Sequence, residues 1–319
     1  MGIYTAASSN ATCDMISNTV LPFKVNAGIL LAVNIVLGFA GLALNLVVFV
    51  SLLSSQLRKK LCYFMIFILS CFDILLVVLA HPALIVDTLN VLFEIELYSM
   101  EWYYFIPLSA LSLTALFTTT LERYLALVYP FFHHKFVTKS RLIVILALMQ
   151  IPFWIPFFVF KSKSATSYIK RYYIGLHTGV LLVMFILNRK IYILVEGLRQ
   201  RADIPMGNLV GSEQQRNIAK KRKVRLGKVS TCLLAVLCSS LCFFPTLIFL
   251  GVDSESAKDG CVPLEIEHDW ILLWAKTFLA MNSTLNSLIF FYKNSVLRRR
   301  GNEVIAKGFS VFKRLLRRQ

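Results

Sequence analysis

Polar side chains that lie inside long apolar segments are the residues of this sequence best suited to do chemistry. Counted from the basic ends of their segments, several of them lie at one common level, roughly 14 to 18 Å deep at 1.5 Å per residue. This layer consists of Asn45, Asp73, Ser112, Asn282, Ser283 and Asn286. Carboxylate, hydroxyl and amide oxygens are the ligands of a small hard cation, so the layer predicts a sodium site at Asp73. The alternative is an interhelical hydrogen-bond network around a protonated Asp73.

A second group of candidate residues lies at the basic end of the third apolar segment. Glu122, Arg123 and Tyr124 place an acid beside a guanidinium, which predicts either a local ion pair or a switch. Protonating Glu122, or giving Arg123 another partner, would free five hydrogen-bond donors for a cytosolic protein. In the sixth segment, Pro245 removes a backbone hydrogen bond and predicts a hinge.

Lys276 is the one basic residue in the middle of the seventh apolar segment, about 10 Å from Asp269 along a helix. Its ammonium group either reaches the outer surface or faces the interior. In the second case it would pair with a ligand carboxylate or with Glu101.

The composition requires lipid as the solvent for most of the chain. Of 319 residues, 57% are hydrophobic and only 16% are charged. The net charge of +17 lies in short clusters between apolar runs, which favours an anionic membrane surface as partner and argues against nucleic acid. His81 and His177 have no evident metal-ligand or nucleophile partners, so we expect no enzyme activity and no cofactor besides the sodium ion.

Seven apolar stretches are long enough to cross a hydrocarbon layer, which takes about 20 residues. They run approximately over Ala27 to Leu53, Leu61 to Leu84, Trp102 to Tyr129, Leu142 to Phe160, Tyr172 to Leu198, Val229 to Val252 and Trp270 to Tyr292. We therefore expect an all-α membrane protein whose bundle of seven transmembrane helices covers residues 27–292. A tail over 1–26 precedes the bundle, and a short amphipathic helix and basic tail over 293–319 follow it.

The distribution of charge predicts how the chain is oriented. Basic residues follow the first and third segments and precede the sixth, whereas acidic residues, Asp87 among them, fill the opposite loops. Basic loops mark the cytoplasmic side, so we expect an extracellular amino terminus. Residues Met1 to Asn26 contain neither a basic start nor an apolar core, which predicts that there is no cleaved signal peptide. The expected location is the plasma membrane. Asn10 is then a glycosylation acceptor, and Cys13 and Cys261, which both lie on the oxidising side, are expected to form a disulfide.

In their order and spacing, five motifs resemble those of rhodopsin-like G-protein-coupled receptors. Gly41-Leu-Ala-Leu-Asn45 is similar to the span-one asparagine motif, and Leu69-Ser-Cys-Phe-Asp73 to LAxxD. Glu122-Arg123-Tyr124, continuing as far as Pro130, resembles DRY and the loop that follows it. Cys242-Phe-Phe-Pro245 resembles CWxP, and the run from Asn282 to Phe290 resembles NSxxNPxxY. The resemblance covers the chain from Gly41 to about Arg300.

The chain departs from the family pattern at several positions. Phe243 replaces a tryptophan, Ser287 a proline and Phe290 a tyrosine. Tyr98 stands where family members have the cysteine that bridges span three to the second outer loop, and span five has no proline. These departures resemble, weakly, the melanocortin, cannabinoid and lysolipid branch.

The resemblance implies a receptor that binds an extracellular ligand and activates a heterotrimeric G protein. Its sodium site falls on the same six residues as the polar layer, and its coupling and switch residues are Glu122, Arg123, Tyr124, Arg225, Phe243 and Pro245. The expected ligand pocket is lined by Phe105, Ser109, Phe243, Leu247 and Lys276. The alternatives are an ion-coupled transporter or channel with Asp73 at a midplane site, and a non-standard photoreceptor with a displaced Schiff base on Lys276.

One departure predicts raised basal signalling. In many family members an acid at the base of span six restrains the arginine of DRY, whereas Arg225 stands at about that place here and would repel Arg123. Arg225→Glu is therefore expected to lower ligand-free second-messenger output by roughly fivefold or more, the scale of a typical coupling energy. Equal basal output in the parent and in Arg225→Glu would contradict this expectation.

Overall fold

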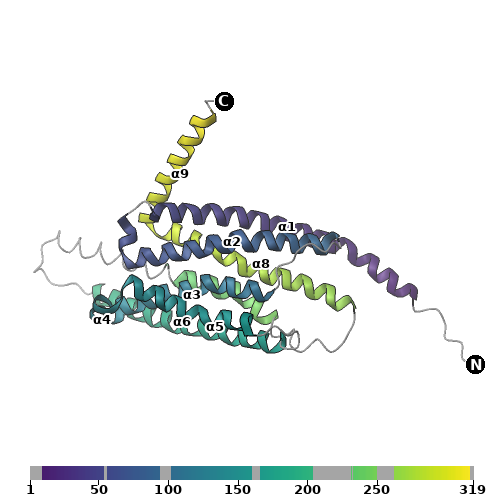
Figure 1. The fold of residues 1–319 in the computed structure, drawn as a ribbon, viewed down its shortest axis with the longest axis horizontal. Helices are drawn as coiled ribbons and strands as arrows, with labels where there is room; N and C mark the ends of the chain where they lie inside the picture. The colour runs from purple at the N-terminus through teal and green to yellow at the C-terminus, as the bar shows by residue number, and fades with distance from the viewer. Residues whose placement is uncertain are drawn as a thin grey trace, which may run out of the picture.

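The computed structural model describes residues 9–53, 56–93, 102–159, 166–203, 231, 233–249 and 262–316, and all regular structure in these residues is helical (Figure 1). In chain order the elements are α1 (Ser9–Leu53), the 3-10 helix η1 (Gln56–Lys59), α2 (Leu61–Phe93), α3 (Trp102–Val128), α4 (Pro130–Phe136), α5 (Lys139–Val159), α6 (Thr166–Asp203), a helix over Leu233–Phe249, α8 (Val262–Lys293) and α9 (Ser295–Leu316). The predicted all-α class is confirmed for the described residues.

Five helices in the described residues are long and apolar enough to cross a membrane, and they coincide with the first five predicted segments. Their apolar parts are Lys24–Leu53, Leu61–Phe93, Phe105–Val128, Lys139–Pro156 and Arg171–Gly197. The helix over Leu233–Phe249 is shorter. Polar side chains interrupt the apolar character of α8, from Lys276 to Ser287. The chain is thus a multi-pass helical membrane protein, while the arrangement of seven spans stays a prediction.

The surface of the bundle is apolar and its interior carries the polar groups. Phe39 is 75% exposed and Leu241 is 72% exposed, and large aliphatic side chains are exposed along α5 and α6 as well. Asp73, Asn45 and Asn286 have no exposed surface at all. Contiguous exposed apolar surface of this kind is the mark of a protein whose solvent is lipid.

Helix α3 lies at the centre of the fold and positions most of the candidate residues. It contacts α2, α4, α5, α6 and α8, and nearly every side chain from Phe105 to Thr120 is buried or almost so. Helices α1 and α2 run side by side, and α8 packs against both of them (Figure 1). Residues of α2, α3 and α8 that face inward therefore meet in one interior.

Two glycines allow helices to approach more closely than any other residue would permit. A Cβ atom on Gly41 would overlap Thr284 Oγ1 and come within 3.0 Å of Val77 Cγ2, so α1 reaches both α2 and α8 only at a glycine. A Cβ atom on Gly301 would overlap the Phe291 ring in the same way. This second contact holds α9 against α8 and α1.

The ends of two helices differ from the sequence-based expectation. Helix α2 continues to Phe93, so the assignment of Asp87 to an outer loop is wrong: Asp87 lies within the helix and is only 6% exposed. An ion pair with α8, described below, offsets the cost of burying it. Helix α3 ends at Val128, one residue before the predicted end, because Pro130 disfavours a helical conformation at Tyr129. Pro130 is itself the first residue of α4, a position that favours proline.

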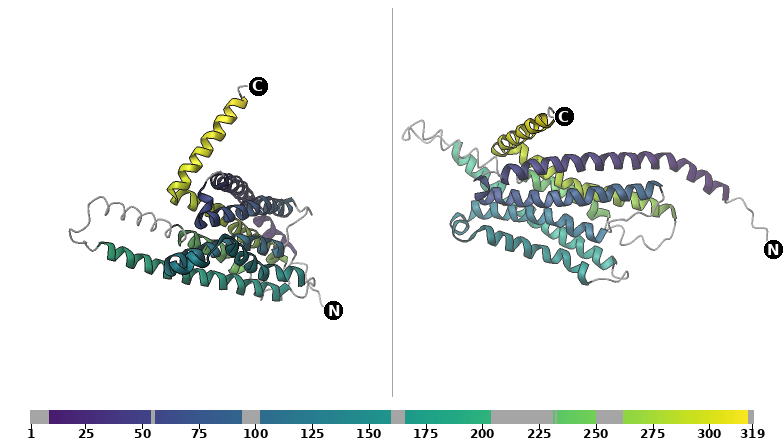
Figure 2. Two further views of the ribbon diagram at one scale, coloured as in Figure 1. Left: turned by 60° about the vertical axis from the view of Figure 1, so that its left-hand side comes forward. Right: turned by 45° about the horizontal axis from the view of Figure 1, so that its top comes forward.

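The two ends of the chain contain more helix than was predicted. Helix α1 begins at Ser9, so helical backbone extends into the segment 1–26 that was predicted as a tail (Figure 1). Helix α9 is a single helix of 22 residues, longer than the short helix expected after span seven. It leaves the bundle at a steep angle to α1 (Figure 2), as a helix lying in a membrane interface would.

Candidate functional site

The predicted polar layer forms one connected group of side chains between α2, α3 and α8. The Ser112 hydroxyl donates a hydrogen bond of 2.5 Å to Asp73 Oδ1, and the Asn286 amide donates to Ser112 Oγ over 3.1 Å. All three side chains are completely buried. Three residues that lie between 39 and 213 positions apart in sequence, on three different helices, thus share one chain of hydrogen bonds.

The remaining members of the layer extend this group to α1 and to the helix over Leu233–Phe249. The Asn45 amide donates to the Ser283 carbonyl over 3.3 Å, and the Ser287 hydroxyl donates to Asn45 Oδ1. Ser239, in the sixth predicted segment, donates to Asn282 Oδ1 over 2.7 Å. The sequence analysis missed Ser239 and the role of Ser287. Ser287 stands at the proline position of NSxxNPxxY, where the hydroxyl instead joins α8 to α1.

Three oxygens of the layer could hold a cation. Asp73 Oδ2, Ser283 Oγ and Asn286 Oδ1 are buried and have no hydrogen-bond partner among the described residues. Ser283 and Asn286 both lie beside the Asp73 carboxylate. A carboxylate with a hydroxyl and an amide oxygen suits a small hard cation, and leaving three such atoms unpaired in a membrane interior is costly. The residues present therefore fit a bound sodium ion.

At the end of α3 that the sequence predicts to be cytoplasmic, Glu122 contacts two basic side chains. Its Oε2 lies 3.5 Å from Arg123 Nε, and its Oε1 lies 3.1 Å from His133 Nε2. Glu122 is buried, and the Arg123 side chain is 15% exposed. The local ion pair expected from the sequence is thus present. His133, which comes from α4, was not predicted, because nothing in the sequence shows that α4 folds back onto α3.

At the opposite end of α2 and α8, Lys276 forms a buried ion pair with Asp87. Lys276 Nζ lies 3.3 Å from Asp87 Oδ2, and both residues are less than 10% exposed. Lys276 therefore faces the bundle interior and does not reach the outer surface. The alternative partner Glu101 lies outside the described residues. We refer to these two residues as the outer pair, after the orientation that the sequence predicts.

A further polar group lies near the outer pair and was not predicted. The Asn34 amide donates to Thr277 Oγ1 over 3.0 Å, and Asn34 Oδ1 lies 3.0 Å from His81 Nδ1. Thr277 follows Lys276 in the sequence, and His81 precedes Asp87 by six residues on α2. Asn34 lies inside the first apolar segment, so the rule that selected Asn45 could have found it, but only the contact of α1 with α2 and α8 decides its partners.

The predicted ligand-pocket residues lie on three elements and are largely packed against protein. Phe105 and Ser109 on α3 are buried, and the Ser109 hydroxyl donates to the Ile106 carbonyl over 2.8 Å. The Phe243 ring lies 5.4 Å from the His177 ring. His177, which the sequence analysis set aside, also contacts Phe153 at 4.9 Å and forms part of an aromatic cluster between α5, α6 and the helix over Leu233–Phe249.

Several predicted residues lie outside what the structure describes. These are Arg225 and Cys261, together with the side chains of Asn10 and Cys13. Pro245 lies inside the helix over Leu233–Phe249, which continues through it, and Leu247 lies in the same helix. Asn282-Ser283-Thr284 also matches the N-glycosylation pattern, but these residues are buried in α8.

The fold and the buried polar interior define the class of this chain as a multi-pass helical membrane protein. No protein-family model matches the sequence, and no curated protein matches it either.

The contribution of the outer pair to the stability of the protein can be tested by substitution. Lys276→Met leaves the Asp87 carboxylate buried without its ammonium partner, which we expect to cost about 3 to 5 kcal/mol of stability. The double variant Asp87→Leu/Lys276→Met removes both charges and should recover most of this loss. The stability of both variants is measured by thermal unfolding of the purified protein, with the reactivity of the buried Cys242 thiol as the signal for unfolding.

The matched control for this test is Arg300→Met, which breaks the exposed pair between Arg300 and Glu303 on α9. An exposed pair contributes about 0 to 1 kcal/mol, so this variant should unfold almost like the parent. A double variant as unstable as Lys276→Met alone would show that Asp87 and Lys276 are not energetically coupled.

Proposed function

We propose that this chain is a G-protein-coupled receptor of the rhodopsin-like class, with seven spans and an extracellular amino terminus in the plasma membrane. The observation that carries this proposal is that α3 contributes residues to two groups of polar and charged side chains, one around Asp73 and one around Glu122. The Asp73, Ser112 and Asn286 chain lies above the contact of Glu122 with Arg123 and His133. Ser112 and Arg123 are eleven residues apart on one helix, or about 16 Å.

The proposed mechanism is a shift of population between a resting and an active conformation. A ligand that enters from outside binds the active conformation more tightly, and only this difference in affinity changes the population. The sixth span then swings outward about Pro245. Arg123 loses its partner Glu122 and contacts a heterotrimeric G protein with its guanidinium. His133 supports this scheme, because it gives the buried Glu122 carboxylate a second basic neighbour when Arg123 leaves.

The remaining proposed features concern the membrane and the outer half of the bundle. The ligand cavity is proposed to be lined by Phe105, Ser109, Phe243, Leu247 and Lys276. Helix α9 exposes apolar side chains such as Phe309, which is 69% exposed, between basic residues, and this supports contact with anionic lipids. Glycosylation at Asn10 and a disulfide between Cys13 and Cys261 belong to the same proposal.

Nucleotide exchange tests the receptor function without a known ligand. The full chain in lipid nanodiscs is mixed with purified heterotrimeric G proteins of each main subtype, and GTP binding is followed over time. Glu122→Gln weakens the hold on Arg123 and should raise basal exchange by roughly fivefold or more. Glu303→Gln, which removes an exposed acid on α9, is the matched control and should leave exchange unchanged.

Two results would contradict the receptor proposal. One is that neither the parent nor Glu122→Gln accelerates exchange above empty nanodiscs with any subtype, although both remain folded. The other is a flux of ions across proteoliposomes that contain the parent chain, since this would indicate a transporter or channel with Asp73 at its transport site.

We further propose that a sodium ion binds the polar layer and favours the resting conformation as a negative allosteric effector. The proposed ligands come from Asp73, Ser112, Ser283 and Asn286, while Asn45 and Asn282 hold the neighbouring helices in place. When bound, the ion neutralises the buried carboxylate. The three unpaired oxygens at Asp73, Ser283 and Asn286 support this proposal.

Sodium-dependent stability tests this site. Replacing choline chloride with sodium chloride should stabilise the parent by about 1.4 kcal/mol when sodium is at ten times its Kd. Asp73→Asn removes the charged ligand and should abolish the dependence. Asp87→Asn removes another buried carboxylate outside the layer and should retain it. A sodium effect that is equal in the parent and in Asp73→Asn would refute the site.

A further inference from the structure

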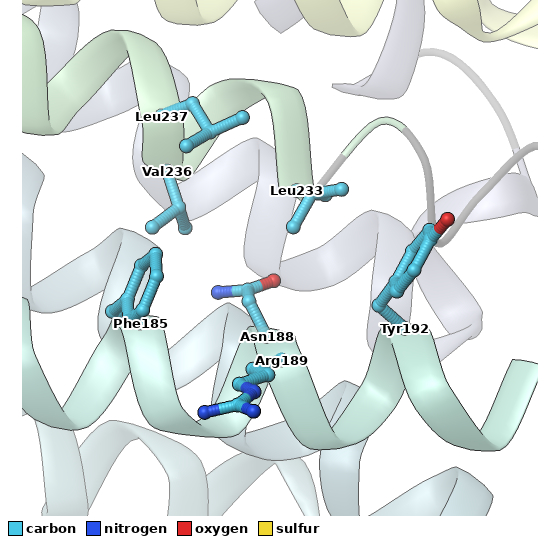
Figure 3. Close-up of a pocket in the computed structure, with 7 residues that line it drawn as sticks. All are labelled: Phe185, Asn188, Arg189, Tyr192, Leu233, Val236 and Leu237. Atoms are coloured by element: carbon cyan, nitrogen blue, oxygen red, sulfur yellow. The ribbon is translucent and has the colours of Figure 1, made fainter.

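A cavity of about 220 Å³ lies between α6 and the helix over Leu233–Phe249, away from the candidate residues described above (Figure 3). It is lined by Phe185, Asn188, Arg189, Tyr192, Leu233, Val236 and Leu237. We refer to it as the lateral cavity. The receptor proposal assigns no role to the residues that line it, although Leu233, Val236 and Leu237 belong to the sixth predicted segment.

The walls of the lateral cavity face the lipid. Phe185 is 55% exposed, Tyr192 is 53% exposed and Leu237 is 44% exposed, so the cavity opens through the side of the bundle. Ordinary small-molecule sites measure about 300 to 1,000 Å³ and enclose most of their ligand. A smaller, mainly apolar cavity that opens into a bilayer is suited to one end of a longer molecule whose remainder lies in the lipid.

Asn188 places an unpaired acceptor in this apolar cavity. The side chain is only 2% exposed, and its amide donates to the Met184 carbonyl over 2.8 Å. Its Oδ1 atom is buried and has no hydrogen-bond partner among the described residues. In Figure 3 the side chain points from α6 toward Leu233 and Val236. Leaving a carbonyl oxygen unpaired at membrane depth is costly, so an occupant that donates a hydrogen bond would be favoured.

Arg189 supplies a positive charge at the same cavity. It lies eight residues before Gly197, the end of the apolar part of α6, or about 12 Å along the helix. The side chain is exposed, and among the described residues no carboxylate forms a salt bridge with it. A guanidinium beside hydrocarbon is expensive unless it reaches an anion.

We propose that the lateral cavity binds an anionic membrane phospholipid. One acyl chain packs against Phe185, Val236 and Leu237, the phosphate contacts the Arg189 guanidinium, and a headgroup hydroxyl donates to Asn188 Oδ1. The apolar walls and the opening toward lipid favour this occupant over a soluble molecule, as do an acceptor and a cation that have no partner among the described residues. The tests below measure lipid binding and not nucleotide exchange, so failure of this site would leave the receptor proposal untouched.

Photo-cross-linking tests this site on the full chain in phosphatidylcholine nanodiscs. The probes are phosphatidylglycerol and phosphatidylcholine with the same diazirine-bearing acyl chain, each added at trace amounts. Phosphatidylglycerol should label peptides that contain Phe185 to Tyr192 or Leu233 to Leu237, at about ten times the yield of phosphatidylcholine, as expected for a charge-assisted hydrogen bond.

Matched variants distinguish binding in the lateral cavity from a general electrostatic attraction of anionic lipid to the surface of the protein. Arg189→Gln should abolish the preference for phosphatidylglycerol, whereas Lys190→Gln removes a neighbouring charge that does not line the cavity and should retain it. Val236→Trp fills the cavity and should remove the labelling. Leu241→Trp introduces the same residue at an exposed position of the same helix and should leave the labelling unchanged. If Val236→Trp does not fold, Leu237→Trp fills the cavity from its opening.

Three results would overturn the proposal. Equal labelling by the two probes would remove the anionic requirement, and equal losses in Arg189→Gln and Lys190→Gln would show only general attraction. Labelling that survives both cavity-filling variants would place the lipid elsewhere.

Discussion

A carboxylate can remain in the interior of a lipid-embedded bundle only if neighbouring helices supply polar atoms to it. Asp73 meets this constraint through Ser112 on α3 and the amide of Asn286 on α8. The same requirement fixes the rotation of three helices about their own axes, because turning any of them would expose an unpaired polar group to hydrocarbon. The packing of the bundle around α3 therefore depends on this one group of hydrogen bonds.

Polar contacts occur at three depths, and each joins a different set of elements. The contact of Glu122 with His133 joins α3 to α4, the middle layer joins α2, α3 and α8, and the outer pair joins α2 to α8. Most of the remaining contacts between the helices are made by apolar side chains. A bundle held by a few discrete polar contacts can exchange one set for another, which is what the proposed switch requires.

The departures from the family motifs have local physical consequences. Ser287 stands where the rhodopsin-like motif has a helix-bending proline, and its hydroxyl donates a hydrogen bond to Asn45, so α8 is tied to α1 at this point. Phe243 replaces a tryptophan and packs against His177 on α6. Both replacements exchange one interhelical contact for another and leave the polar layer intact.

The sequence by itself determined the helical class, the apolar segments and the depth of the polar layer, because hydropathy and a rise of 1.5 Å per residue are local properties. Asp73, Ser112 and Asn286 could be placed at one level in this way. Only the tertiary structure decided which atoms meet. Asp87 was assigned to a loop, and Asn34, His133 and Ser239 were not predicted, because burial and pairing depend on helix rotation and on contacts between segments far apart in the chain.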